Sequence, residues 1–222
     1  PPFGKKWEKD QDAVTKEHKE KGFNGRFGPG LPRINDGSML FLLHLASKME
    51  LPEKGGGRVA IVLSGSPLFN GGAGSGESEI RRWLLEKDLV EAIIALPTEI
   101  FFRTGIGTYL WILSNKKPEN RRKRVQLINA ADQWVSIKNE GNKRRIISEE
   151  QIHRIAEIYA AAETNELSRM LDYRVFGYRR IRALRPLRMS LHINSATMEN
   201  LKTEKAWIKL TGEQKEVLRA EL

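Results

Sequence analysis

The stretch Arg58-Val59-Ala60-Ile61-Val62-Leu63 is an uninterrupted apolar run, rich in β-branched residues, that follows three glycines. Such a run predicts a strand that is buried on both faces, as in a parallel sheet. A glycine-rich loop follows at Asn70–Gly76, and the apolar spacing predicts a helix from about Ser78, with Ile80, Trp83 and Leu84 turned inward. The succession of strand, glycine-rich loop and helix is typical of an open α/β sheet.

Three further apolar runs predict the rest of the sheet, at Val90–Leu96, Thr108–Leu113 and Arg124–Asn129. The last two flank a short basic turn and are predicted to pair as an antiparallel hairpin or to lie as neighbouring strands. A helix is predicted at Asp36–Met49, with Asp36 or Ser38 as its N-cap, whereas residues 1–35 are predicted to be irregular. We expect an α/β fold that is the second half of an open sheet, with its first half outside this chain.

The pattern changes to helices beyond residue 146. Ser148-Glu149-Glu150-Gln151 is a capping-box pattern that predicts a helix start. We therefore expect residues 1–146 to belong to the sheet domain and residues 147–222 to form a basic helical extension.

Composition excludes several classes of protein. The chain has 222 residues, of which 40% are hydrophobic and 30% charged, which is ordinary for a globular protein and too apolar for a wholly disordered one. No apolar run is long enough to predict a membrane-spanning helix or a signal peptide, so we expect a cytoplasmic protein without membrane contact. There is no cysteine and there are four scattered histidines, so no metal site is predicted.

The charge is strongly positive, at +10 with a pI near 9.8, which indicates a polyanionic partner such as nucleic acid. Basic residues concentrate in Asn115–Arg145 and again in Asp172–Arg188, where aromatic residues are interleaved. These clusters are either solvated loops or contacts to phosphates. The candidates for DNA contact are Arg121, Arg122, Lys123, Arg174, Arg179, Arg180 and Arg182.

Two loops are candidate ligand-binding sites. Gly71–Ser78 has the spacing of a phosphate-binding P-loop, but Glu77 stands where that loop needs its lysine. We therefore expect a conformational loop, free to move or to bury its glycines against a neighbour. In Phe101–Thr108, the two phenylalanines either line a flat pocket for a base, or one of them is core and the glycines make a tight turn.

Several segments in a fixed order carry a family resemblance. In chain order they are Pro1-Pro2-Phe3, the Asp36–Met49 helix, Gly56–Leu63, the glycine-rich loop, Ile94–Pro97 and Phe101–Thr108. This order resembles the adenine-specific DNA methyltransferases and, more narrowly, the modification (M) subunit of type I restriction-modification systems. The resemblance covers roughly residues 1 to 188, including Phe176-Gly177-Tyr178 and Arg185-Pro186-Leu187. It implies a Rossmann-like, S-adenosylmethionine-dependent methyltransferase sheet.

The resemblance also implies roles for individual residues. The family's catalytic motif is Asn-Pro-Pro-Phe, so the asparagine is expected directly before Pro1. The target adenine is turned out of the duplex, and the asparagine oxygen and a motif carbonyl accept its amine hydrogens. Carried over, Pro1 supplies the carbonyl, Pro2 keeps the backbone rigid and Phe3 stacks on the base. Phe102, and Phe101 beside it, stack from the opposite side.

The implied cofactor is S-adenosylmethionine. The family's glycine-rich cofactor loop and acidic ribose contact have no match in this chain, so we expect most of that site upstream and the chain alone to be inactive. The implied partners are DNA, a specificity subunit that reads its sequence, a second modification subunit and, where the system has one, a nuclease subunit. Two alternatives stay open: a non-catalytic basic module that binds nucleic acid, and a tail that assembles subunits without touching DNA.

Overall fold

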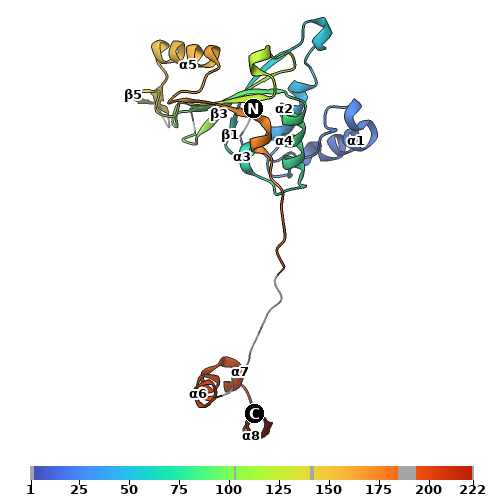
Figure 1. The fold of residues 1–222 in the computed structure, drawn as a ribbon, viewed down its shortest axis with the longest axis vertical. Helices are drawn as coiled ribbons and strands as arrows, with labels where there is room; N and C mark the ends of the chain where they lie inside the picture. Colours follow the sequence, from blue (N-terminus) through green and yellow to red (C-terminus); the bar gives the residue numbers. More distant parts are fainter. Residues whose placement is uncertain (1–2, 103, 141–142, 185–193, 222) are drawn as a thin grey trace. The chain divides into compact units, whose positions relative to one another are not determined.

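The computed structural model describes residues 3–102, 104–140, 143–184 and 194–221. The chain divides into two compact units, Pro1–Arg180 and Ile181–Leu222, and Figure 1 shows the sheet within the first of them. The boundary between the units therefore falls later than the predicted residue 146. The reason is that residues 147–180 add a helix and an edge strand to the sheet unit.

The strands and helices follow the predicted α/β succession. The strands are β1 Arg58–Ser64, β2 Val90–Leu96, β3 Thr108–Ser114, β4 Arg124–Asn129, β5 Val135–Glu140, β6 Lys143–Ile146 and β7 Ser168–Asp172. The helices are α1 Gln11–Lys21, α2 Ser38–Ala46, α3 Ser66–Phe69, α4 Gly76–Glu86, α5 Glu149–Ala161, α6 Ser195–Thr203, α7 Lys205–Ile208 and α8 Gly212–Glu221. Short 3-10 turns lie at Glu8–Asp10, Gly22–Asn24, Pro52–Lys54, Glu119–Arg121 and Tyr173–Phe176.

The main sheet is mixed, with the strand order β1-β3-β2-β4-β7. β3 runs antiparallel to both β1 and β2, β4 runs parallel to β2, and β7 closes the sheet antiparallel to β4. The predicted pairing of Thr108–Leu113 with Arg124–Asn129 is wrong, because β2 lies between these two strands. The prediction of a parallel environment for β1 is also wrong, since its described neighbour is antiparallel and its first residues are exposed.

Asp88 explains why the basic turn after β3 crosses over β2 instead of folding back. Its carboxylate accepts hydrogen bonds from the Lys117 ammonium at 2.7 Å and from the Lys123 backbone N–H at 2.9 Å. Asp88 itself stands two residues before the start of β2. Both ends of the turn are therefore hydrogen-bonded to Asp88. The turn crosses the start of β2, and β4 pairs with β2 on the side opposite β3.

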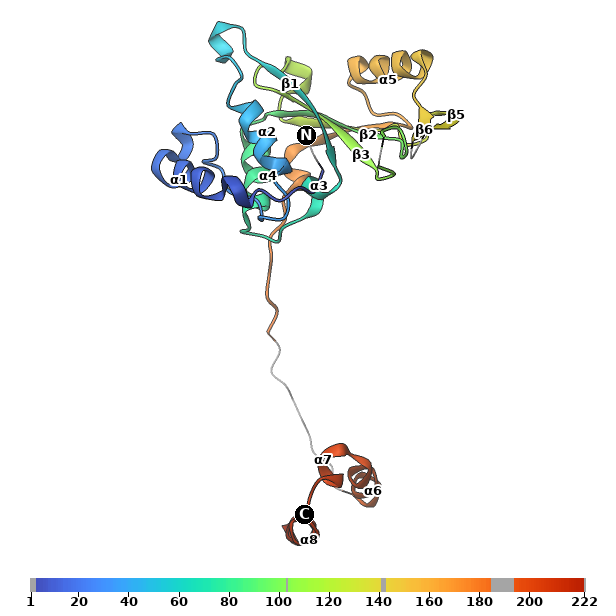
Figure 2. The ribbon, with the colours of Figure 1, turned by 180° about the vertical axis from the view of Figure 1, so that it is seen from behind.

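Helices cover both faces of the sheet (Figures 1 and 2). On one face, α2 and α4 bury a continuous apolar cluster against β1, β3 and β2. The predicted inward residues of α4 lie there, with Ile80 and Leu84 fully buried. On the other face, α5 packs over a smaller cluster that includes Ile94, Ile112 and Ile128. The alternation of buried side chains along β3, with Trp111 on one face and Ile112 on the other, is the period of two that a strand imposes.

The segment before α2 is more ordered than predicted, because α1 forms within it. Residues 11–21 are highly charged, but they are rich in helix-forming residues and include no glycine or proline. Glu17 on α1 binds Arg26 at 2.5 Å, and this hydrogen-bonded ion pair lowers the pKa of Glu17 to about 2. The helix is thereby tied to the loop that returns toward α2.

The second unit is helical, as predicted for the end of the chain. Its described helices are α6, α7 and α8. Among its described side chains Trp207 is a buried apolar one, with the Arg219 guanidinium 5.9 Å from the ring centroid. None of the helices in the described part of the chain is both long and apolar enough to cross a membrane.

Candidate functional site

The carboxyl ends of β1, β2 and β4 meet at one edge of the sheet. The strand directions require this, because β1 and β2 are both antiparallel to β3 while β4 is parallel to β2. The loops that follow Ser64, Leu96 and Asn129 therefore share this edge. Ligands of open α/β sheets bind outside the carboxyl ends of the strands, so this edge is the candidate site.

The loop between β2 and β3 carries the two candidate stacking residues. Phe101 is partly buried and forms an isolated antiparallel bridge with Thr104, whereas Phe102 is 62% exposed. The Lys143 ammonium lies 4.8 Å from the centroid of the Phe102 ring. The two phenylalanines therefore differ in their environment: Phe101 lies nearer the interior, whereas Phe102 is exposed to solvent.

The start of the chain reaches the same edge. Pro1 and Pro2 lie outside the described residues, and Phe3 is a partly buried turn residue. The Lys5 carbonyl accepts a hydrogen bond from the Gly37 N–H at 3.0 Å, which places the segment after Phe3 beside the start of α2.

Asp36 fastens the start of α2 to the end of β1. Its Oδ1 accepts from the backbone N–H and the hydroxyl of Ser38, at 3.0 and 2.6 Å, and its Oδ2 accepts from the Ser66 hydroxyl at 2.7 Å. Burial acts to raise the pKa of Asp36, but the hydrogen bonds from Ser38 and Ser66 outweigh it and lower the pKa. The prediction of Asp36 or Ser38 as the N-cap is wrong, because the N-cap of α2 is Gly37, which has no side chain to cap the helix. The link from Asp36 to Ser66 has no signal in the sequence, because it joins residues far apart in the chain.

The glycine-rich loop does not bind phosphate in the manner of a P-loop. Glu77 is buried, and its carboxylate accepts the Arg33 backbone N–H at 3.0 Å and faces the Arg33 side chain at 3.8 Å. A Cβ on Gly76 would lie 1.6 Å from the Leu31 carbonyl oxygen, so only glycine fits there. Of the two predicted behaviours, Gly76 is packed against the neighbouring Leu31 segment, whereas Gly72 and Gly74 are exposed.

The predicted DNA-contact residues differ widely in exposure. Arg121 is 4% exposed, and its guanidinium donates to the Gln126 side chain at 2.9 Å and to the Tyr159 carbonyl. It also faces the buried carboxylate of Glu91 at 3.6 Å. Arg121 therefore serves the interior of the fold, and we leave it out of the DNA contacts proposed below.

The remaining candidates are at the surface. Arg122 forms an exposed ion pair with Glu119 at 2.9 Å, and the Lys123 ammonium lies 5.1 Å from the Tyr173 ring centroid. Arg174 is paired with Asp172 through two hydrogen bonds of 2.8 and 2.9 Å. The others are exposed and fall in both units, namely Arg179 and Arg180 in the first and Arg182 in the second.

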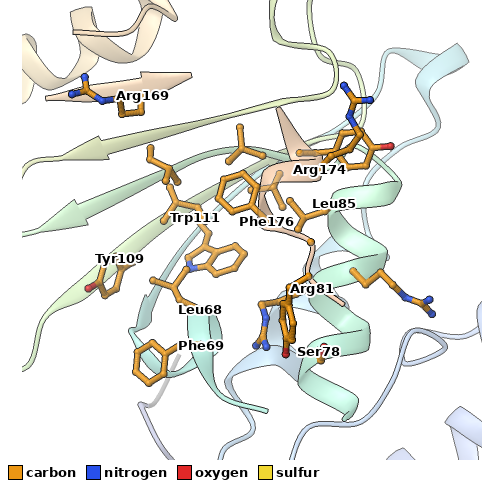
Figure 3. A pocket seen from close by; sticks show the side chains of 18 of the residues that line it. Leu68, Phe69, Ser78, Arg81, Leu85, Tyr109, Trp111, Arg169, Arg174 and Phe176 are labelled. Carbon is orange, nitrogen blue, oxygen red and sulfur yellow. The ribbon is translucent and has the colours of Figure 1, made fainter. Parts of the chain in front are cut away.

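A groove of about 1180 Å³ opens on the α4 side of the sheet. Figure 3 shows the Trp111 indole in its middle, between Leu68 and Phe176. Its arginines are already engaged, for example Arg81 with the carbonyls of Pro67 and Asn70 at 3.1 and 2.7 Å. Acidic side chains from α4 also line it, so the groove is apolar with a rim of mixed charge.

The fold and this edge define a class of protein. The family described as N-6 DNA Methylase matches residues 1–174, and the chain therefore belongs to the N-6 DNA methylase family. The methylase subunit of the type I restriction enzyme MjaVII of Methanocaldococcus jannaschii is 36% identical over 118 residues, which are 52% of this chain and 19% of that protein. The methylase subunit of EcoKI of Escherichia coli K12 is 43% identical over 53 residues, 24% of this chain and 10% of that protein.

Solved structures agree with this assignment. The methyltransferase subunit of a type I restriction-modification system from Streptococcus thermophilus superposes with a TM-score of 0.62 at 28% identity, over 78% of this chain and 33% of that one. The predicted α/β methyltransferase fold and the resemblance to type I modification subunits are confirmed. The chain spans less than a quarter of the length of the two curated relatives named above.

Proposed function

We propose that this chain forms the base-stacking part of a type I modification subunit, which transfers a methyl group from S-adenosylmethionine to the exocyclic amine of adenine in DNA. Family membership and the type I relatives support a DNA methyltransferase role. The observation that carries the finer proposal is the exposed ring of Phe102 at the carboxyl edge of the sheet. An aromatic face at this edge offers a stacking platform for an extruded base.

The chemistry asks for orientation more than for a strong base. The lone pair of the adenine amine is delocalised into the ring, so a site must localise it and aim it at the methyl donor. We propose that the Pro1 carbonyl accepts one amine hydrogen and that an asparagine directly before it accepts the other. Pro2 fixes the backbone, and Phe3 and Phe102 hold the ring from its two faces, with Phe101 supporting its neighbour.

S-adenosylmethionine supplies an electrophilic methyl group when bound. The described residues do not by themselves fit it, because the glycine-rich loop of this chain ends in a carboxylate that is already bound to Arg33. We therefore propose that most of the contacts to the cofactor come from residues outside this chain. The part that this chain takes is to hold and orient the base.

We propose that the surface arginines and lysine contact the DNA backbone. Exposed ion pairs such as that of Arg122 with Glu119 contribute little to stability, so the guanidinium can exchange its carboxylate for a phosphate at small cost. The proposed contacts are Arg122, Lys123, Arg174, Arg179, Arg180 and Arg182. A specificity subunit, a second modification subunit and, where present, a nuclease subunit are the proposed protein partners, in line with the type I relatives.

The test is Phe3→Ala in the complete modification enzyme that carries this chain. We expect transfer of labelled methyl groups to DNA to fall at least about 10-fold, with DNA affinity retained, because only the orientation of the base is lost. Phe23→Ala is the matched control, since Phe23 is 71% exposed and lies near α1. The absence of any methyl transfer by the parent enzyme, with DNA binding retained, would favour the alternative of a non-catalytic binding module.

A further inference from the structure

The loop that presents Phe102 holds a residue in a strained conformation. Glu99 has φ of 60°, in the left-handed region that side chains with a Cβ disfavour. Such a residue persists only where its surroundings over-determine it, and these positions cluster at functional sites. Inside the loop, the described contacts are few: the Phe101–Thr104 bridge and a 3.3 Å hydrogen bond from the Ile106 N–H to the Thr104 hydroxyl.

The second strand of the β5–β6 hairpin, β6, makes the contacts that hold Glu99 in this conformation. The backbone N–H groups of Arg144 and Arg145 both donate to the Glu99 carbonyl, at 3.0 and 3.2 Å. Their guanidinium groups also face the Glu99 carboxylate, at 3.8 and 3.7 Å. The strained residue is therefore held by its carbonyl and by its side chain from a single neighbouring strand.

Arg145 is the centre of this contact. Its guanidinium donates to the Thr98 hydroxyl at 2.8 Å and lies 4.0 Å from the centroid of the Trp134 ring. The Arg145 side chain is only 28% exposed, unlike that of Arg144 at 60%. A planar cation held by a ring on its face and by oxygens at its edge is oriented in a way that a lysine cannot reproduce.

Lys143, two residues earlier on the same strand, contacts the stacking residue itself. Its ammonium lies 4.8 Å from the Phe102 ring centroid, and the ring remains 62% exposed. A cation over one face of the ring leaves the other face for a base and brings a positive charge to the place where a DNA strand would pass.

We propose that Arg145 and Lys143 are positioning residues for the methyl transfer. Arg145 fixes the loop through Thr98 and Glu99, and Lys143 fixes the ring of Phe102, so that the β5–β6 hairpin sets the orientation of the base-stacking residue. The proposal rests on the proposed function, because it takes Phe102 as the residue that meets the target adenine.

The experiment compares Arg145→Gln, Arg145→Lys and Lys143→Gln with the parent in the complete modification enzyme. Hydrogen exchange of the amides of residues 98–102 measures whether the hairpin holds the loop. Steady-state methylation of plasmid DNA with labelled S-adenosylmethionine separates kcat from KM. We expect Arg145→Gln to speed exchange at least about 10-fold and to lower kcat about 10-fold, with the KM for DNA changed less than about 2-fold. We expect Arg145→Lys to rescue little and Lys143→Gln to show a smaller kcat loss.

Phe102→Ala provides the decisive cross-check. If Arg145 acts through Phe102, Arg145→Gln costs much less kcat in the Phe102→Ala background than in the parent, because the two changes remove the same contribution. Equal losses in both backgrounds, or unchanged loop exchange in Arg145→Gln and Lys143→Gln, contradict the proposal. Arg154→Gln, an exposed change of the same kind on α5, is the control. A parent enzyme without methylation defeats the proposed function, whereas the exchange measurement still decides whether the hairpin holds the loop.

Discussion

Two basic regions that look alike in the sequence have opposite roles in the structure. The turn between β3 and β4 holds Lys117 and Arg121, which are 7% and 4% exposed. Lys117 faces Asp88 and Arg121 faces Glu91, at 2.7 and 3.6 Å. The β6 strand, by contrast, places Lys143 and its two arginine neighbours beside the exposed Phe102 loop, where Arg144 is 60% exposed. The first region joins strands, and the second borders the candidate site.

The difference lies in the acidic partners, which are distant in the sequence. Asp88 and Glu91 lie at the start of β2, and the basic turn passes directly over them. Burial lowers the pKa of Lys117, while the facing carboxylate of Asp88 acts in the opposite direction. A cation that is buried against such a partner is not available to a polyanion, however basic its surroundings are in the sequence.

The largest expected effect is a loss of stability when the buried ion pair of Arg121 with Glu91 is broken. Arg121→Met leaves the Glu91 carboxylate, which is 1% exposed, with the half-exposed Arg58 as its one ion-pair partner among the residues that the structure describes. Breaking a buried pair in this way costs about 3 kcal/mol of unfolding free energy. Urea denaturation measures the loss, and Arg122→Met, whose side chain is 63% exposed, is the control, with a change below about 0.5 kcal/mol. Equal effects of the two changes contradict the assignment of Arg121 to the interior.

A smaller effect, on DNA affinity, is expected when the exposed Arg144 is changed. Arg144→Gln removes a charge that is paired only with Glu99 among the described residues. We expect DNA affinity to fall several-fold, and the slope of log affinity against log salt to become shallower by about 0.9, the value for one lost phosphate contact. Fluorescence anisotropy of a labelled duplex between 50 and 200 mM salt measures both. An unchanged slope shows that Arg144 does not reach the backbone.

The smallest effect is confined to high pH. Burial, followed by the 2.8 Å hydrogen bond to Glu91, raises the pKa of Tyr159 to about 12. An unfolded tyrosine titrates near 10, so the stability that Tyr159 contributes is complete below pH 10 and is lost as the pH rises toward 12. We expect Tyr159→Phe to flatten the fall of the unfolding free energy in this window, relative to the parent. Parallel curves for the two proteins argue against the raised pKa.

Much of the fold could be predicted because its signals are local. The apolar runs of β1 to β4, the capping box at Ser148 and the inward face of α4 are patterns within a few residues. The pairing of the strands could not be predicted in the same way. The insertion of β3 between β1 and β2 depends on contacts between distant residues, and adjacency in the sequence favoured the wrong hairpin.

In the candidate site, too, the local features could be predicted from the sequence and the long-range contacts could not. Phe101 and Phe102 could be identified from an aromatic pair followed by glycines, together with the family resemblance. The contacts of Arg145 with Thr98 and of Lys143 with Phe102 join segments about forty residues apart, so the sequence showed only a run of positive charge. Burial separated Arg121 from the other basic candidates, and burial is a property of the folded chain.

The central claim is that Phe102 stacks on the adenine that becomes methylated. The direct measurement is mass spectrometry of N6-methyladenine in plasmid DNA treated with the complete modification enzyme, with Phe102 intact or changed to alanine, beside a binding assay. We expect N6-methyladenine from the parent, a loss of rate of at least about 10-fold in Phe102→Ala, and DNA affinity that stays within about 2-fold. Equal methylation rates for the two enzymes would contradict it.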